Sequence, residues 1–76
     1  MPKNKIETKK VFLRESWGEG KELRVTTTQI GDKVRPTIRE WYKDANDNWA
    51  PGKGVSLFYE NLPGVIKALQ QILEED

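Results

Sequence analysis

The sequence predicts an α+β fold: a four-stranded antiparallel β-meander followed by one C-terminal α-helix, in the order ββββα. Between residues 9 and 59, short segments rich in β-branched and aromatic residues alternate with turn-forming residues, as in a run of strands. The links between these segments are short, which favours antiparallel neighbours. Beyond residue 60 the apolar residues instead recur at i, i+3, i+4 and i+7, the spacing of an amphipathic helix.

Four strands follow from this pattern. We expect them at residues 9–17, 22–29, 33–43 and 55–59, with a glycine-rich turn at 18–20, a two-residue hairpin at Gly31–Asp32 and a long loop over residues 44–54. Pro36 lies inside the third segment and lacks a backbone N–H for the ladder. The sequence therefore predicts a bulge or a strong bend at Pro36.

The C-terminal segment carries the helical stripe, with Asn61 as its expected N-cap. The apolar residues of this stripe are Leu62, Val65, Ile66, Leu69, Ile72 and Leu73. We expect one face of the sheet to rest on them.

The composition indicates one small domain, residues 9–76, preceded by a flexible lysine-rich arm, residues 1–8. The chain has 76 residues, no cysteine and no histidine, so disulfides and the usual zinc sites are not expected. A chain of this size buries only about 60% of its unfolded surface, which makes oligomerisation an attractive source of further burial. No signal peptide and no membrane-spanning run is apparent, so we expect an intracellular protein that does not contact a membrane.

Charge is distributed unevenly. Residues 1–53 hold twelve Lys and Arg against eight Asp and Glu, a net of +4, whereas residues 54–76 hold one Lys against four acids, a net of −3. The first part therefore favours a basic surface for a polyanion.

Strand alternation then separates the side chains into two sets. The expected core set is Val11, Leu13, Leu23, Val25, Val34, Ile38, Val55 and Leu57, with Trp17 on the same side. The expected outward set is Lys10, Phe12, Arg14, Arg24, Lys33, Arg35, Arg39 and Trp41. This second set interleaves cations with aromatic rings, which is typical of a surface that neutralises phosphates and stacks on bases.

Three more residues complete the candidate site. Tyr42 lies next to Trp41, Trp49 falls in the expected loop, and Lys53 precedes the fourth strand. A bulge near Tyr42 would move its ring to the outward face, so the choice of Trp41 or Tyr42 as the stacking ring stays open. Without His or Cys, and with acids that show no ligand spacing, we expect no catalysis, no metal site and no cofactor.

The run Ile38-Arg39-Glu40-Trp41-Tyr42, followed after a loop by Pro51-Gly52-Lys53-Gly54-Val55-Ser56-Leu57 and a helix, resembles the positive-cofactor-four (transcriptional coactivator p15) single-stranded-DNA-binding domain family. The resemblance covers about residues 10–73. It implies a curved sheet, a homodimer with helices packed across its interface, and DNA contacts at Lys33, Arg39, Trp41, Tyr42 and Lys53. In the family the second aromatic is the usual stacking residue, which favours Tyr42, whereas strand alternation favours Trp41.

The chain departs from the family pattern at the second hairpin, where Ile30-Gly31-Asp32-Lys33 lacks one ring and one cation. The serine-rich tail of the eukaryotic coactivators is replaced by the short lysine-rich arm. A bacterial or phage protein of replication, recombination or repair therefore fits as well as a transcription factor, with the nucleus or the cytoplasm and nucleoid as its location. Binding of RNA and recruitment of transcription or replication proteins remain alternatives.

Overall fold

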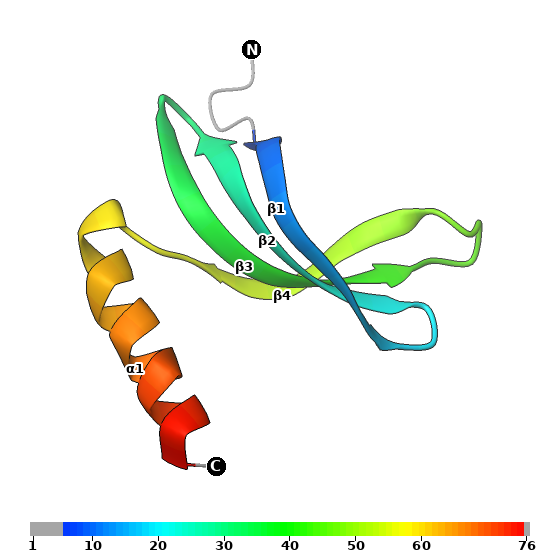
Figure 1. The fold of residues 1–76 in the computed structure, drawn as a ribbon. Coiled ribbons are helices and arrows are strands. Elements are labelled where there is room, and N and C mark those ends of the chain that lie inside the picture. The colour runs from blue at the N-terminus through cyan, green and yellow to red at the C-terminus, as the bar shows by residue number, and fades with distance from the viewer. Residues whose placement is uncertain (1–5, 76) are drawn as a thin grey trace.

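The computed structural model describes residues 6–75, and these residues form the expected ββββα order. The elements are β1 (Ile6–Gly18), β2 (Lys21–Ile30), β3 (Lys33–Lys43), β4 (Trp49–Ser56), a 3-10 turn η1 (Tyr59–Asn61) and α1 (Leu62–Glu75). The strands make one antiparallel sheet in sequence order, with β1 and β4 at its edges. Figure 1 shows this sheet strongly curved.

The ladder between β2 and β3 runs without interruption from Lys21↔Tyr42 to Ile30↔Lys33. The expected bulge at Pro36 is therefore wrong, because Pro36 pairs in register with Thr27. Pro36 accepts a hydrogen bond from the Leu57 N–H at 2.7 Å, so its carbonyl points toward β4. The regular β3–β4 ladder ends at Thr37↔Ser56, and the Leu57 carbonyl, to which Pro36 has no N–H to donate, accepts from the Arg35 Nε at 3.2 Å.

β1 and β4 differ from the expected strands. β1 begins at Ile6, inside the segment expected to be a flexible arm, whose residues 1–5 lie outside the described part. β4 begins at Trp49 rather than at residue 55, so the expected long loop shrinks to residues 44–48. Asp44 closes that turn by accepting hydrogen bonds from the Asn46 and Asn48 N–H groups at 2.9 and 3.0 Å. Trp49 consequently pairs with Lys43 in the sheet.

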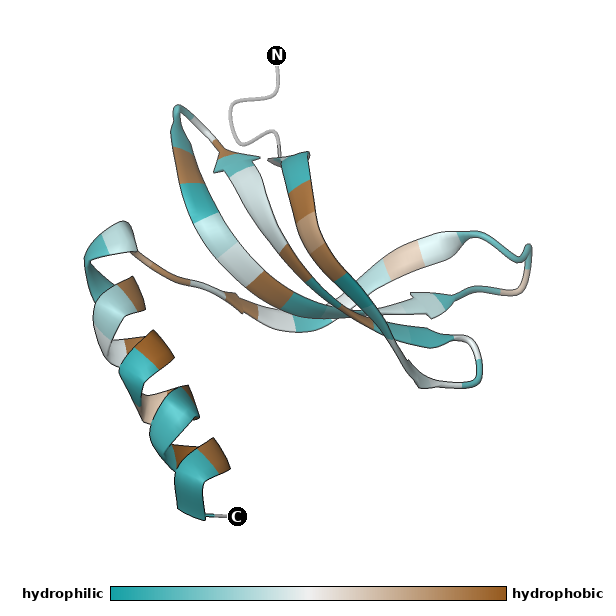
Figure 2. Ribbon diagram, in the orientation of Figure 1, coloured by the Kyte–Doolittle hydropathy of each residue, from teal (hydrophilic) through white to brown (hydrophobic). Residues whose placement is uncertain are grey.

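α1 does not cover the sheet. Its main contacts with the other described elements are with η1, and the helix extends away from the strands in Figure 1. Asn61, the expected cap, instead accepts a hydrogen bond from the Phe58 N–H at 3.2 Å through its side-chain oxygen. The apolar stripe is nonetheless regular, as the hydrophobic bands along one side of α1 in Figure 2 show.

The expectation of a core between sheet and helix is thus wrong for the single chain. No hydrophobic side chain is buried among the described residues, and Leu69 and Ile72 are 53% and 63% exposed. The radius of gyration is 14.2 Å, compared with about 11 Å for a compact chain of this length. In the described region, no helix is long and apolar enough to cross a membrane.

Candidate nucleic-acid interface

Strand register assigns side chains to the two faces of the sheet. Residues paired across the ladders share a face, as in Arg14↔Arg24, Arg24↔Arg39 and Thr37↔Ser56. The face that contains the arginines is called the polar face below. It holds Arg14, Ser16, Glu22, Arg24, Thr26, Thr28, Arg35, Thr37, Arg39, Trp41, Lys43, Trp49 and Ser56. The opposite face holds Leu23, Val25, Val34, Ile38, Glu40, Tyr42 and Val55.

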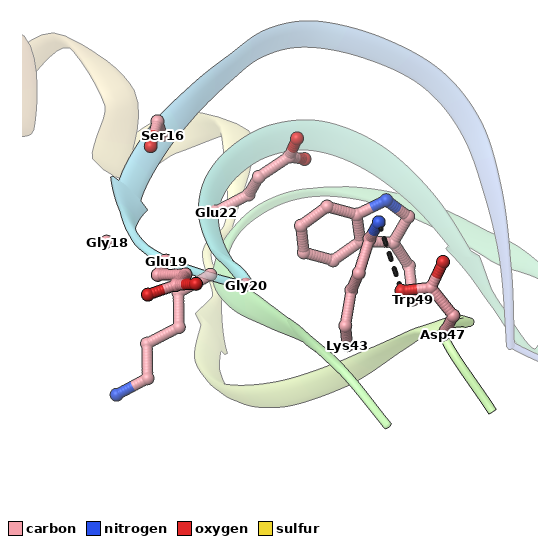
Figure 3. Close-up of a pocket in the computed structure, with 9 residues that line it drawn as sticks. Ser16, Gly18, Glu19, Gly20, Glu22, Lys43, Asp47 and Trp49 are labelled. Atoms are coloured by element: carbon pink, nitrogen blue, oxygen red, sulfur yellow. Dashed lines mark ion pairs between the residues drawn. The ribbon is translucent and has the colours of Figure 1, made fainter. Parts of the chain in front are cut away.

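At one end of the polar face, cations and indole rings are stacked in turn. The Arg24 guanidinium lies 4.3 Å from the Trp41 ring centroid and 5.3 Å from that of Trp49. The Lys43 ammonium lies 5.4 Å from the Trp49 ring and 3.3 Å from Asp47, as Figure 3 shows. Cation–π attraction and partial desolvation hold this cluster together within one chain.

Glu22 joins this cluster to β1. Its carboxylate accepts hydrogen bonds from the Arg14 Nε and Nη2 and from the Arg24 Nε, each at 2.9 Å. The bond from Arg14, followed by the one from Arg24, holds the pKa of Glu22 below its ordinary value despite partial burial. The same bond raises the pKa of Arg14. Glu22 also lines a cavity of about 580 Å³ together with Lys43, Asp47 and Trp49 (Figure 3).

The centre of the polar face is a floor of hydroxyl groups. Thr26, Thr28 and Thr37 are 5%, 6% and 3% exposed. Their hydroxyls are satisfied locally, by a 3.1 Å contact between Thr26 and Thr28 and a 3.3 Å contact between Thr37 and Ser56. Above this floor lies a cavity of about 320 Å³, lined by Thr8, Thr26, Thr28, Ile30, Thr37, Arg39, Trp41 and Pro51.

The Pro51–Gly54 segment forms a bulge in β4, which explains its glycines. β3 and β4 shift register between Arg39↔Gly54 and Trp41↔Pro51, which places a bulge at Gly52 and Lys53. The Arg39 Nη1 donates to the Gly52 carbonyl at 2.8 Å and braces this bulge. A Cβ at position 54 would lie 2.6 Å from the Ile38 carbonyl oxygen, so only glycine permits this approach of the strands.

Arg35 lies on the polar face but is engaged elsewhere. Its Nε and Nη2 donate to the Leu57 and Ser56 carbonyls at 3.2 and 3.0 Å, and its guanidinium lies 4.2 Å from the Phe58 ring centroid. Arg35 therefore fixes the chain where it leaves β4 for the helix. Of the eleven residues predicted to contact DNA, Arg35 is the one whose guanidinium holds the link between β4 and η1 in place.

Two of the predicted contact residues in β1, Lys10 and Phe12, are not brought to the polar face. β1 shifts register at three places, and the shifts between Thr8 and Lys10 and between Val11 and Leu13 invert its alternation on either side of Lys10 and Val11. Lys10 pairs with Thr27 on the opposite face and its ammonium lies 5.0 Å from the Phe12 ring. Val11, expected in the core, pairs instead with Thr26 of the polar face.

The remaining predicted residues are spread over the molecule. Lys33 is exposed at the β2–β3 hairpin, where the uninterrupted register of β3 places it at the far end of the polar face, as strand alternation predicted. Lys53 lies in the bulge beside a cavity that also contacts Trp17. Tyr42 is 44% exposed on the opposite face, whereas Trp41 lies on the polar face, as strand alternation predicted. Trp17, expected in the core, is 58% exposed.

Glu22 and the threonine floor were not among the predicted site residues. Glu22 has the same parity as Arg24, and strand alternation alone would have placed it on the basic side. Strand alternation placed Thr26 and Thr28 on the polar side, but their burial and that of Thr37 were not predicted.

Comparisons with known proteins agree with this architecture. Residues 17–68 match the family described as Transcriptional Coactivator p15 (PC4). Among solved structures, the bacteriophage T5 homologue of the eukaryotic transcription coactivator PC4, implicated in recombination-dependent DNA replication, is similar, with 33% identity and a TM-score of 0.73 over 83% of this chain and 75% of that chain. A comparison with curated proteins finds no match. The matched segment spans more than half of the sequence, and the chain belongs to the transcriptional coactivator p15 (PC4) family.

Proposed function

We propose that the protein is a non-catalytic homodimer that binds single-stranded DNA without sequence preference. Membership of the family supports a DNA-binding role. The observation that carries the proposal is the polar face, where Arg14, Arg24 and Arg39 lie on one curved surface with Trp41 and Trp49. Cations along a groove with adjacent rings suit a strand whose phosphates and bases are both accessible.

The engagement of the arginine side chains within the chain supports binding without sequence preference. The arginine forks of the polar face are paired with Glu22 or with backbone carbonyls, as in the bond from Arg39 to Gly52. Arginine charge and ring surface act on every nucleotide alike, because each has a phosphate and a π-face. The relative's implication in recombination-dependent replication favours replication or recombination over transcription as the process.

The uncovered helix supports the homodimer. The chain has 6199 Å² of accessible surface, whereas a folded monomer of 8.8 kDa has about 4,800 Å². The excess of roughly 1,400 Å² exceeds the ~800 Å² that each partner buries in a standard interface. A second copy of the chain would cover the stripe of α1 and supply the core that one chain lacks.

A titration of fluorescent oligo-dT tests the binding. We expect tryptophan emission to change and the logarithm of the binding constant to fall with the logarithm of salt with a slope of about −3 to −4, for about five neutralised phosphates. Arg39→Ala should weaken oligo-dT, oligo-dA and mixed sequences equally. Salt-insensitive binding with unchanged fluorescence would contradict the proposal, and tighter binding of a matched RNA would assign the face to RNA.

A further inference from the structure

Glu22 places a carboxylate among the arginines at one end of the polar face. Among the described strand residues assigned to the polar face it is the one acidic side chain, with Asp47 in the adjoining turn, and it is only 18% exposed. A negative charge here repels DNA phosphate and lowers the local positive potential. If the polar face binds DNA, the presence of a carboxylate at this position requires an explanation.

The geometry around Glu22 is the geometry with which arginine binds phosphate. The Nε and Nη2 of Arg14 donate in parallel to the two carboxylate oxygens, both at 2.9 Å. Two oxygens of a phosphodiester match this fork in the same way. Glu22 thus occupies the Arg14 donors that a DNA backbone would otherwise use.

The two arginines that share Glu22 are not equally free to move. Arg24 is 12% exposed and is held against the Trp41 and Trp49 rings. Arg14 is 49% exposed and projects from the edge strand β1. Arg14 can therefore leave Glu22 without disturbing the cluster, whereas Arg24 cannot.

We propose that Arg14 is a phosphate site that Glu22 occupies in the free protein, and that a backbone phosphate of the bound strand displaces Glu22 from it. This inference rests on the proposed function. In the bound state the Arg14 fork holds the phosphate, and Glu22 keeps its bond to Arg24 and so maintains the stacked cluster. Glu22 then competes with DNA phosphate for Arg14, which weakens DNA binding. At the same time Glu22 holds Arg24 in the position in which it can contact DNA.

The test compares oligo-dT affinity of the full chain and its variants by fluorescence anisotropy. Glu22→Gln keeps the shape of the side chain and removes its charge, and we expect it to tighten binding about two- to fivefold, the worth of one exposed ion pair. Arg14→Gln should weaken binding and make the salt slope shallower by about 0.7. In the Arg14→Gln background, Glu22→Gln should give no gain in affinity, because the guanidinium for which Glu22 and phosphate compete is gone.

Glu15→Gln is the matched control. It makes the same change of net charge one residue away from Arg14, at a position that pairs with Leu23 on the opposite face. We expect its affinity to stay close to that of the wild type. A gain with Glu15→Gln equal to that with Glu22→Gln would overturn the proposal, because it would show a general charge effect.

Other outcomes separate the two ideas. Unchanged or weaker binding by a folded Glu22→Gln variant, or a gain that persists without Arg14, overturns the competitor role. If Glu22→Gln does not fold, the salt slope of Arg14→Gln decides, since a slope equal to that of the wild type means that Arg14 meets no phosphate. Failure of the wild type itself to bind oligo-dT contradicts the proposed function instead.

Discussion

The polar face of the sheet and the helix α1 differ in how far one chain satisfies their side chains. On the polar face, arginines, threonines and indole rings find their partners within one chain, through bonds such as those from Arg14 and Arg24 to Glu22. On α1 the apolar stripe stays largely exposed, and among the described elements the main contacts of the helix are with η1. Hydrogen bonds and cation–π contacts can be completed by neighbours on a strand, whereas a helix stripe needs a second apolar surface. The proposed binding surface is thus complete in one chain and the core is not.

Breaking the helix stripe should have the largest effect. Leu69→Asp should dissociate the proposed dimer, because each buried Leu contributes about 1.5–3 kcal/mol and the change occurs in both copies. The dissociation constant should rise about 10²- to 10⁴-fold, measured by light scattering over a concentration series. Gln71→Glu, on the other side of α1, should leave the mass unchanged. A wild-type protein that is monomeric at high concentration would show that the stripe has another partner.

Gly54→Ala should have the next largest effect, on the sheet itself. The new Cβ would lie 2.6 Å from the Ile38 carbonyl and from Arg39 Cβ, so β3 and β4 must separate. We expect a loss of about 3 kcal/mol in the free energy of unfolding, as for an overpacked core. Gly64→Ala is the control. No atom lies within 4 Å of where the new Cβ would be, and the free energy of unfolding should rise by up to about 1 kcal/mol. Equal responses of the two glycines would contradict the bulge.

Trp41 and Tyr42 test which ring serves the polar face. Trp41 lines the cavity above the threonine floor and supports Arg24, whereas Tyr42 is on the opposite face. Trp41→Leu should therefore weaken oligo-dT binding by about 1–3 kcal/mol, measured as a change in the binding constant. Tyr42→Leu should change it less. The reverse order would mean that the DNA strand contacts the opposite face of the sheet rather than the polar face.

Arg35 should separate stability from binding. Arg35→Gln removes the hydrogen bonds to the Ser56 and Leu57 carbonyls, with an expected loss of about 1–1.5 kcal/mol in the free energy of unfolding and little change in DNA affinity. Lys33→Gln, at an exposed hairpin, should do the opposite and make the salt slope shallower by about 0.7. Urea unfolding and anisotropy on both variants measure the contrast. Strong loss of affinity without loss of stability in Arg35→Gln would return Arg35 to the DNA contacts.

The pH dependence of stability should give the smallest effect. Glu22 has a lowered pKa in the folded protein, caused first by the hydrogen bond from Arg14. Its contribution is therefore complete above the unfolded carboxylate pKa of about 4.3 and is lost as the pH falls through the lower folded value. The difference in melting temperature between the wild type and Glu22→Gln should shrink from pH 7 to pH 3. A constant difference would mean that the ion pair adds nothing to folding.

Part of the fold could be predicted because its signals are local. The order of the elements and the bounds of β3 agree with the sequence pattern, and alternation assigned β2 and β3 correctly because their ladder has no bulge. Alternation failed for β1, where two register shifts exchange the faces of Lys10 and Val11. The turn at residues 44–48 was missed because Asp44 closes it through its side chain.

By itself, the sequence determined the element order, the basic character of the N-terminal two thirds and the family motif around Arg39 and Gly54. These depend on spacing of two or three to four residues, which the chain carries locally. Only the tertiary structure decided which cations are available. Arg35 is committed to carbonyls 21 and 22 residues away, and Arg14 is paired with a carboxylate on the next strand. Such partners meet only when the sheet is assembled and curved, so charge counts along the chain could not distinguish them.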